Sequence, residues 1–313
     1  MHIPVLRDAV LENLLPGRAP DSATPGRVVE RVIDGTLGAG GHAAALLEHG
    51  VRSLLGLDCD EMALEIARAS LAVYGERVHL AHASYANMTD EVARLGWDGV
   101  DAILLDLGVS SMQLDTPERG FAFRSEGPLD MRFDPGGSRP TAADLVNSLD
   151  ERDLADLFFR YGEERDSRRL ARAVVRQRPF ATTRDLATVI ERAAPRHHDD
   201  RIHPATRVFQ ALRIAVNDEL DVIGNALPQA IRLLRPGGRL AVISFHSLED
   251  RIVKAAFRLA STDCICPPKV PICICGHHAS VRLISRKPIT ADEHESAENP
   301  RSRSARLRVV EKL

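Results

Sequence analysis

A glycine-rich loop between two apolar runs constrains the fold of this chain more than any other feature. Residues 28–34 are rich in Val and Ile and end on Asp34, and the loop Gly35-Thr-Leu-Gly38-Ala-Gly40-Gly41 follows them. After a helix-forming stretch, a second apolar run at 53–58 again ends on an acid, Asp58. Runs of β-branched residues favour strands, and glycines mark a tight turn between a strand and a helix. The pattern predicts a strand, a loop, a helix and a second strand, with a carboxylate at the end of each strand.

The same alternation continues as far as residue 106. A helix is expected at 61–73, a third strand at 78–82, and a fourth strand in the nearly continuous apolar run Asp101-Ala-Ile-Leu-Leu-Asp106. An uninterrupted apolar run is typical of a central strand that is buried on both faces. Alternating strands and helices imply a parallel sheet, so the predicted fold class is α/β, a doubly wound Rossmann-like sheet. Ligands bind at the carboxyl ends of such strands, where Asp58 and Asp106 stand.

The pattern changes after Asp106 and resumes near residue 204. A loop rich in Gly and Pro leads into four segments with helical patterning, at 141–148, 150–161, 165–177 and 183–193. Beyond them we expect helices at 204–216, 220–234 and 248–259, a turn at Arg235-Pro-Gly-Gly238, a strand at 239–244, and an antiparallel strand pair at 280–285 and 305–310. The sequence thus predicts a discontinuous sheet domain, residues 1–116 and 203–313, interrupted by an all-helical insertion at 117–202.

The glycine loop alone does not identify its ligand. Gly38-x-Gly40-x-x-Ala43 satisfies the dinucleotide fingerprint, and both a nicotinamide dinucleotide and S-adenosylmethionine (SAM) need glycines here and an acid after the second strand. The glycines could also serve only a tight turn. Asp106-Leu-Gly-Val-Ser110-Ser111 places an acid and hydroxyls at the end of the fourth strand, and the late antiparallel pair suits a methyltransferase better than a dehydrogenase. A NAD-dependent oxidoreductase remains the alternative.

Charge and hydropathy limit the class of partner. The formal net charge of −3 argues against nucleic-acid binding through bulk charge, but residues 160–213 hold 13 Arg against 7 Asp and Glu, and the stretch 301–312 is basic too. Two such clusters favour a polyanionic substrate, although solvated helix faces would look the same. No apolar run is long enough to span a bilayer, and the first residues lack the layout of a secretory signal. We expect a soluble, cytoplasmic chain without a membrane partner.

Several long strings together resemble one family, the bacterial 16S rRNA (cytosine-N4)-methyltransferases, from one end of the chain to the other. They are His2-Ile-Pro-Val-Leu6, Asp34-Gly-Thr with Gly40-Gly-His42, Leu105-Asp-Leu-Gly-Val-Ser-Ser111, Gln113-Leu-Asp115, Arg119-Gly-Phe121, Gly127-Pro-Leu-Asp-Met-Arg132, His203-Pro-Ala-Thr-Arg207, Phe209-Gln-Ala-Leu-Arg213, Ser244-Phe-His-Ser-Leu-Glu-Asp-Arg251 and Asn299-Pro-Arg-Ser-Arg-Ser-Ala305. Strings of this length are far more specific than the glycine loop.

The resemblance implies methyl transfer from SAM to the exocyclic N4 of a cytosine in the decoding centre (P site) of 16S rRNA, in the small (30S) ribosomal subunit. It makes residues 1–116 and 203–313 the methyltransferase domain and the helical insertion a candidate rRNA-recognition domain. By the same resemblance, seven residues would contact SAM: Gly40, Gly41, His42, Asp58, Tyr85, Asp106 and Gln113. A non-catalytic RNA-binding assembly factor with a relic cofactor pocket is a further alternative, and a homodimer is left open.

The chemistry of an exocyclic amine suggests which residues act on it. The N4 lone pair is delocalised into the ring, so a neighbouring group must hold the amine and accept its proton. The candidates are Asp106, Ser110 with Ser111, Asn217 and His246, although Ser110 and His246 could equally cap helices. Phosphates would be held by Arg119, Arg132, Arg207 and Arg213. The competing C5 methylation needs a cysteine nucleophile, and none follows Asp106 or stands within 244–247.

Four of the 5 cysteines, Cys264, Cys266, Cys273 and Cys275, crowd into one short stretch. Four thiols could close a tetrahedral zinc site, and a reducing compartment disfavours disulfides. The spacing, however, is Cys-x-Cys where zinc sites more often have Cys-x2-Cys. Zinc and a loop of free thiols both stay open on the sequence, and no metal is included in the predicted site.

Overall fold

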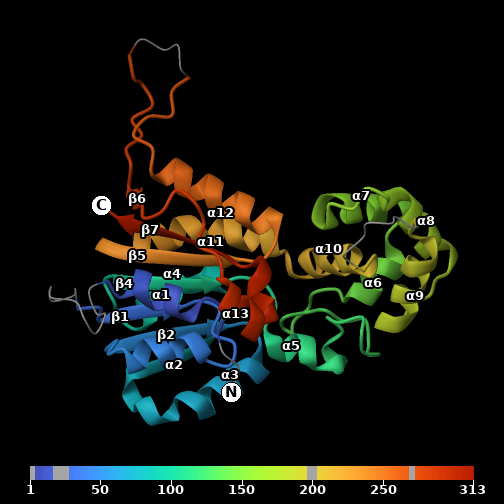
Figure 1. Cartoon of the computed structure of the whole chain (residues 1–313), viewed down its shortest axis with the longest axis horizontal. Helices are drawn as coiled ribbons and strands as arrows, with labels where there is room; N and C mark the ends of the chain where they lie inside the picture. Colours follow the sequence, from blue (N-terminus) through green and yellow to red (C-terminus); the bar gives the residue numbers. More distant parts are fainter. Residues whose placement is uncertain (1–3, 17–27, 196–202, 268–271) are drawn as a thin grey trace. The chain divides into compact units, whose positions relative to one another are not determined.

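The chain folds into two compact units, and each is described by itself (Figure 1). The structure, a computed structural model, describes residues 4–16, 28–195, 203–267 and 272–313. His2 and Ile3 of the first family string, and Arg196 and Arg201 of the arginine-rich stretch, lie outside the described residues. The first unit comprises Met1–Gly108 with Leu220–Leu313, and the second comprises Val109–Glu219.

The first unit is built on a seven-stranded sheet in the order β3-β2-β1-β4-β5-β7-β6. The strands are β1 (Arg31–Asp34), β2 (Ser53–Asp58), β3 (Val78–His82), β4 (Val100–Asp106), β5 (Leu234–Ser244), β6 (Val281–Leu283) and β7 (Arg306–Lys312). Neighbouring strands from β3 to β5 pair in parallel, whereas β7 is antiparallel to both β5 and β6. The predicted α/β parallel sheet is therefore correct.

Both faces of this sheet carry a hydrophobic core. Along β4, Ala102 and Leu104 belong to one core, and Ile103 and Leu105 to the other, as the period of two in a strand requires. The first core is covered by α1 (Arg7–Leu14), α2 (Gly41–Glu48) and α3 (Glu61–Leu71), and the second by α4 (Met88–Arg94), α11 (Glu219–Leu233) and α12 (Ser247–Ala260). This double cover explains why β4 reads as an uninterrupted apolar run.

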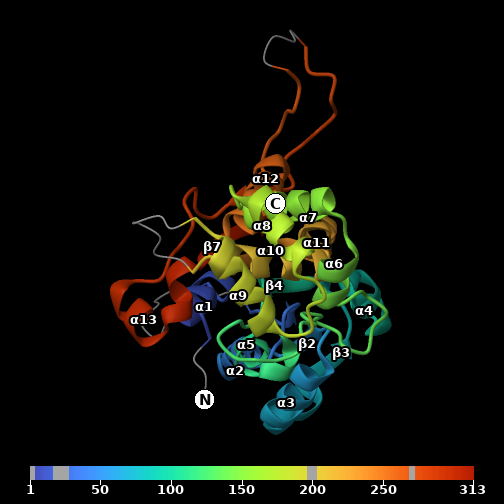
Figure 2. The ribbon, with the colours of Figure 1, turned by 90° about the vertical axis from the view of Figure 1, so that its right-hand side faces the viewer.

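The second unit has a hydrophobic core of its own, made by helices (Figure 2). Its α-helices are α5 (Ser111–Asp115), α6 (Ala142–Ser148), α7 (Glu151–Gly162), α8 (Ser167–Arg176), α9 (Thr183–Ala193) and α10 (Ala205–Asn217). The unit is wider than the predicted insertion at 117–202, because α10 belongs to it. Val208, Phe209 and Leu212 of α10 are buried in the helical core, so this helix packs within the second unit, against α7.

Other expectations differ in detail. The turn predicted at 235–238 lies inside β5, as an irregularity in its pairing with β4, where Val100 pairs with Leu234 and Ala102 with Arg239. The late strands are antiparallel as predicted, but β7 lies between β5 and β6. Four short α-helices in the described part of the chain were not predicted: α1, α4, α5 and α13 (Glu293–Glu298). Among the residues that the structure describes, no helix is both long enough and apolar enough to cross a membrane.

Candidate active site

Three carboxylates stand at the carboxyl ends of neighbouring parallel strands in the first unit. Asp34 ends β1, Asp58 ends β2 and Asp106 ends β4. They are close enough that the charges of Asp58 and Asp106 raise the pKa of Asp34. The edge of the sheet at which ligands bind in this fold class is thus lined with acid.

The glycine loop is tied to these strands by its backbone. The Gly35 N–H donates to Leu104 O and the Leu37 N–H to Leu57 O, both at 2.9 Å. A Cβ on Gly35 would lie 2.6 Å from Leu105 Cδ2 and 3.0 Å from Tyr85 Cβ, so any larger residue would push the loop away from β4. Glycine is required here by this close approach of the loop to the sheet.

Asp58 holds the turn that carries the loop. Its Oδ2 accepts the Gly38 N–H at 2.8 Å, and its Oδ1 accepts the Asp60 N–H at 2.9 Å. Burial raises the pKa of the Asp58 carboxyl, and these two N–H groups oppose that rise. Gly40, whose φ of 83° suits glycine, then leads into α2, which begins at Gly41.

Several buried polar atoms beside the loop have no hydrogen-bond partner within the described part of the chain. They are Asp34 Oδ2, His42 Nε2 and Asp106 Oδ1. His42 Nε2 lies 3.7 Å from the other carboxylate oxygen, Asp106 Oδ2. The Asp106 N–H donates to Thr36 Oγ1 at 2.6 Å, which fixes the strand end against the loop. Because buried polar groups are normally paired, this cluster points to a polar ligand.

The charge of the cluster discriminates between the two cofactors. SAM carries a sulfonium and an ammonium group, which carboxylates attract, whereas the pyrophosphate of a nicotinamide dinucleotide would be repelled. Burial raises the pKa of Asp34 to about 6, against the opposing effect of His42 and of the Thr36 N–H. A cationic ligand would relieve this unfavourable burial. The residues present therefore fit SAM, with Asp58 available to its ribose hydroxyls.

The remaining two predicted cofactor contacts, Tyr85 and Gln113, belong to different units. Tyr85 begins the 3₁₀ turn Tyr85–Asn87 after β3, in the first unit and next to Gly35. Gln113 lies in α5 of the second unit and is buried. Its side-chain Oε1 accepts the Ser110 N–H at 3.0 Å, while Ser110 Oγ accepts the Gln113 N–H at 3.2 Å. Ser110 thus caps α5, the alternative role that the sequence left open.

His246 lies in the first unit, two residues beyond the end of β5. It occupies the N-cap position of α12, and its side chain is 11% exposed, with Nε2 3.2 Å from Glu249 Oε1. Glu249 Oε2 accepts the Phe245 N–H at 2.8 Å. His246 Nδ1 is buried without a hydrogen-bond partner among the described residues. His246 thus pairs with Glu249 at the start of α12, in agreement with the capping role that the sequence left open, and its buried ring lies near the ends of the central strands.

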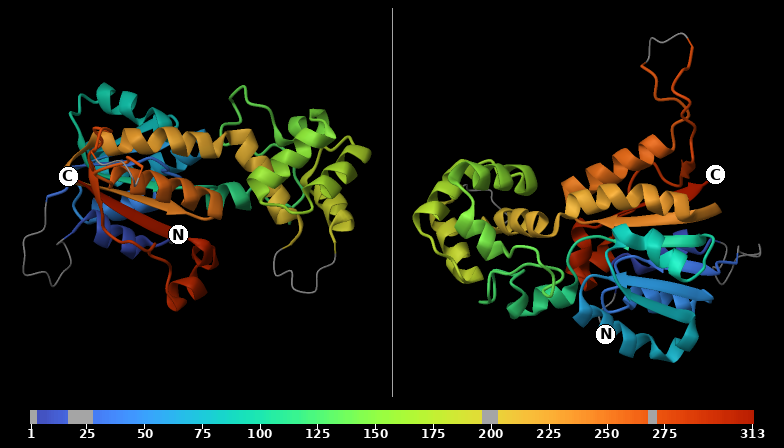
Figure 3. Two further views of the ribbon diagram at one scale, coloured as in Figure 1. Left: turned by 90° about the horizontal axis from the view of Figure 1, so that it is seen from above. Right: turned by 180° about the vertical axis from the view of Figure 1, so that it is seen from behind.

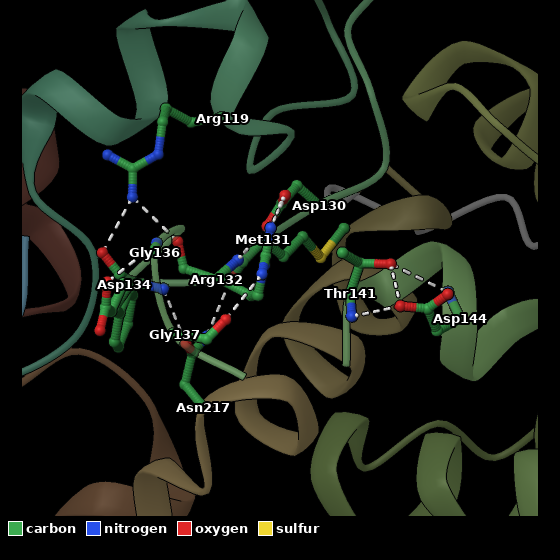
Figure 4. A network of polar contacts seen from close by, with 11 residues as sticks. Arg119, Asp130, Met131, Arg132, Asp134, Gly136, Gly137, Thr141, Asp144 and Asn217 are labelled. Carbon is green, nitrogen blue, oxygen red and sulfur yellow. Dashed lines mark hydrogen bonds and ion pairs between the residues drawn. The ribbon is translucent and has the colours of Figure 1, made fainter. Parts of the chain in front are cut away.

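Asn217, the last residue of α10, anchors a loop of the second unit (Figure 4). Its Nδ2 donates to Met131 O at 2.8 Å and to Arg213 O at 2.9 Å, and its Oδ1 accepts the Phe133 N–H at 2.8 Å. Both amide hydrogens are used, so the side chain has no donor left for a base. These contacts give Asn217 a structural role in holding the loop.

Two of the predicted phosphate-binding arginines serve the same loop. Arg119 is buried and donates to Arg132 O at 2.9 Å and Phe133 O at 3.0 Å. Arg132 makes a bidentate pair with Asp130, with two N···O distances of 2.8 Å, and holds the pKa of that carboxyl below its usual range. Both guanidinium groups are engaged within the second unit (Figure 4).

The other two predicted arginines differ in exposure. Arg213 pairs with Glu219 at 2.7 and 2.8 Å, and its side chain is only 16% exposed. Arg207 is 47% exposed, 3.8 Å from Glu164, and lines a cavity of about 620 Å³ in the second unit. Of the four, Arg207 is the one whose surface is open to a phosphate.

Sequence reasoning missed three residues that shape the site. Asp34 ends an apolar run just as Asp58 and Asp106 do, and this shared pattern could have identified it. Thr36, two residues later, accepts the Asp106 N–H. Glu249 stands three residues after His246, a spacing that places a carboxylate over a helix N-terminus.

Comparison with known proteins identifies the family of the chain over its whole length. The sequence profile of the MraW methylase family matches residues 1–313. Proteins called ribosomal RNA small subunit methyltransferase H are 50% identical in Dehalococcoides mccartyi, over 100% of this chain and 86% of that protein, and 50% identical in Geobacter sp. (strain M21), over 100% and 98%. The protein of that name from Syntrophotalea carbinolica is 52% identical over 100% of this chain and 98% of its own length. The chain therefore belongs to the MraW methylase family.

Proposed function

We propose that this chain transfers a methyl group from SAM to the exocyclic N4 of a cytosine in the rRNA of the small ribosomal subunit. One observation supports this chemistry above all. The buried Oδ1 of Asp106 stands beside the glycine loop and has no hydrogen-bond partner among the described residues. Relatives about half identical over the whole chain, each named as a small-subunit rRNA methyltransferase, support the substrate class.

SAM supplies a methyl group on a sulfonium, which is activated without help from the protein. The task of the chain is to orient the amine, whose lone pair is delocalised into the ring. Asp106 Oδ1 is the acceptor that would hold an amine hydrogen and so favour a pyramidal nitrogen. Thr36, which accepts the Asp106 N–H, would fix the strand end that carries the carboxylate, and His42 Nε2 lies 3.7 Å from Oδ2.

The positions of the cysteines support N4 over C5 as the methyl acceptor. C5 methylation requires a thiolate at the site to attack the ring covalently. Cys59 follows β2 on the ribose side of the glycine loop, and the other four cysteines lie between α12 and β6. Methylation of an amine needs a group that holds the nitrogen and its lone pair in position, and it needs no covalent bond to the protein. The carboxylate at the end of β4 is such a group.

The second unit offers an arginine-rich helix face to the rRNA. In α8, Leu170, Ala171 and Val174 are buried, whereas Arg168, Arg169, Arg172 and Arg176 are exposed. Residues four apart lie on one side of a helix, so Arg168, Arg172 and Arg176 form one row. Arg172 also pairs with Glu151 at 3.1 Å. We assign this face, together with Arg207, to phosphate contacts, and the helical unit to rRNA recognition.

Two measurements test this function. In calorimetric titrations SAM should bind and NAD should not; binding of NAD alone would favour an oxidoreductase. The methyl group of labelled SAM should then enter small-subunit rRNA from cells that lack this methylation, presented both as naked 16S rRNA and as assembled small subunits. Faster transfer into the assembled subunit would identify the subunit as the substrate. Bound SAM without transfer to either would instead indicate a non-catalytic assembly factor.

A further inference from the structure

A segment between α12 and β6, residues 261–280, extends from the first unit and contains four cysteines (Figures 1 and 3). We call it the cysteine loop; its residues 268–271 are outside the description. The described part of the loop contains neither helix nor strand. Its two ends are joined at the base, where the Ser280 N–H donates to Ala260 O at 2.8 Å. Few ordinary contacts are thus present to give the loop a defined shape.

The four sulfur atoms of the loop converge. Cys264 Sγ lies 3.4 Å from Cys273 Sγ and 3.9 Å from Cys275 Sγ, and Cys273 Sγ lies 3.5 Å from Cys275 Sγ and 3.9 Å from Cys266 Sγ. All four lie within 4.8 Å of one another, and all are free thiols. A tetrahedral zinc ion with Zn–S bonds of about 2.3 Å requires S···S separations of about 3.8 Å. The observed distances lie around this value.

Isoleucines alternate with the cysteines in both arms of the loop. In an extended segment, residues two apart lie on the same side, so the Cys-x-Cys spacing presents two thiols together from each arm. Ile265 and Ile274 stand between the cysteines and are 50% and 83% exposed. Hydrophobic collapse would bury isoleucine in preference to a thiol. Here the isoleucines are exposed and the cysteines are exposed or half-buried, so apolar packing does not account for the convergence of the four sulfur atoms.

The surroundings suit a negatively charged metal centre. Zinc with four thiolates carries a net charge of −2. Arg251, Lys254 and Arg258 of α12 line a cavity of about 500 Å³ together with Cys264 and Ile265. The Ile265 N–H also donates to Cys275 Sγ at 3.5 Å, and such N–H···S bonds stabilise thiolate ligands. Cationic side chains therefore adjoin Cys264, and a backbone donor adjoins Cys275.

We propose that Cys264, Cys266, Cys273 and Cys275 bind one zinc ion, which closes the base of the cysteine loop as a structural staple. Four protein ligands leave no open position for a substrate, so the ion has no role in methyl transfer. Zinc fits better than a harder cation, because thiolates are soft ligands and four of them impose a tetrahedral geometry. Binding displaces a proton from each thiol that is still protonated, and neither the metal nor the sulfur changes oxidation state.

Metal analysis of the full chain, expressed with added zinc and purified in reductant without chelator, tests the site. The wild type should hold about one zinc ion per chain, and Cys264→Ser/Cys273→Ser should hold less than about a tenth of that. Two matched controls should keep the metal: Cys59→Ser, a thiol outside the loop, and Ile274→Ser, an exposed side chain between two ligands. Wild-type protein without zinc, with iron in its place, or a double variant that keeps its zinc would each overturn the proposal.

Cobalt substitution of the wild type provides a readout that does not depend on a variant folding. One equivalent of Co²⁺ added to metal-free chain should give the intense thiolate-to-cobalt charge-transfer bands of a tetrahedral site, and zinc should abolish them. Zinc should also slow alkylation of the loop thiols at least about tenfold, while Cys59 reacts at an unchanged rate. Weak octahedral cobalt spectra, or thiols that react equally fast with and without zinc, would contradict a zinc site.

Discussion

His42 Nε2 and Asp106 Oδ2 lie 3.7 Å apart, and the outer oxygen of the same carboxylate, Oδ1, is buried without a hydrogen-bond partner in the described part of the chain. The separation of 3.7 Å is too long for a hydrogen bond, so Asp106 Oδ1 and His42 Nε2 are both left for a ligand. Asp106 also ends the central strand β4, where its N–H is fixed by Thr36. This arrangement suits a group that stands at a fixed strand end and receives one hydrogen bond from a substrate.

Replacing Asp106 with Asn should reduce turnover much more than SAM affinity. The amide keeps the shape of the side chain but loses the negative charge that would favour the reacting amine, and groups of this kind contribute about 10²–10⁴ in rate. Single-turnover kinetics together with SAM titration separates the two effects. Asp90→Asn, on an exposed turn of α4, is the matched control and should leave both quantities unchanged. If SAM affinity falls as far as turnover, Asp106 is a cofactor ligand only.

Replacing Asp34 with Asn should stabilise the SAM-free chain at neutral pH. Burial raises the folded-state pKa of Asp34 to about 6, above the ordinary aspartate value of 3.8, so the fold favours the protonated carboxyl. Ionised Asp34 therefore lowers the stability of the fold. This loss of stability is absent below about pH 4, grows up to about pH 6 and is complete above it. A shift of about two pKa units corresponds to about 3 kcal/mol. Urea denaturation of both proteins from pH 4 to pH 8 measures the difference, which should shrink as the pH falls. A pH-independent difference would show that the pKa of Asp34 is not raised.

Replacing Asn217 with Ala should destabilise the second unit. The Phe133 N–H and the carbonyls of Met131 and Arg213 would each lose a partner, which costs about 2–4 kcal/mol when the groups stay buried. Chemical denaturation followed by circular dichroism measures this loss. Asn225→Ala, exposed on α11, should change stability by less than about 0.5 kcal/mol. An Asn217→Ala chain of normal stability but lost turnover would instead place Asn217 in catalysis.

Neutralising two arginines of α8 should weaken rRNA binding in a salt-dependent manner. For Arg168→Gln/Arg176→Gln, the slope of log K against log salt should become shallower by about 1.4, since each phosphate contact on a single strand contributes about 0.7. Turnover at saturating rRNA should not change, because the helix carries no reacting group. The control Arg52→Gln/Arg68→Gln removes the same charge from exposed positions of the first unit. Equal changes in slope for both pairs would mean that α8 makes no localised contact.

The sheet was predictable because its pattern is local. β2 and β3 begin and end at the predicted residues, since each is a short apolar run followed by a polar break. The placement of α10 was not predictable, because an amphipathic helix can bury its apolar face against a sheet or against other helices, and its sequence is the same in both cases. Only the packing of Phe209 and Leu212 into the helical core decides between them.

In the candidate site, too, local patterns were predictable from the sequence and tertiary contacts were not. Asp58 and Asp106 follow from strand ends, whereas the engagement of Arg119, Arg132 and Arg213 within the second unit depends on partners that no spacing reveals. Arg119, for example, binds carbonyls of residues 132 and 133, and Arg213 binds a glutamate six residues away. An arginine-rich stretch therefore indicates a basic surface, but its sequence does not say which arginines remain at that surface. The structure leaves the α8 row exposed.

Nucleoside analysis of small-subunit rRNA methylated in vitro tests the central claim most directly. The rRNA is incubated with SAM labelled in the methyl group, digested to nucleosides and separated by chromatography with mass detection. The proposed reaction predicts label in N4-methylcytidine with the wild-type chain, and a loss of about 10²-fold or more with Asp106→Asn. Label in C5-methylcytidine or in any nucleoside other than N4-methylcytidine, or SAM-bound chain that transfers no label, would contradict it.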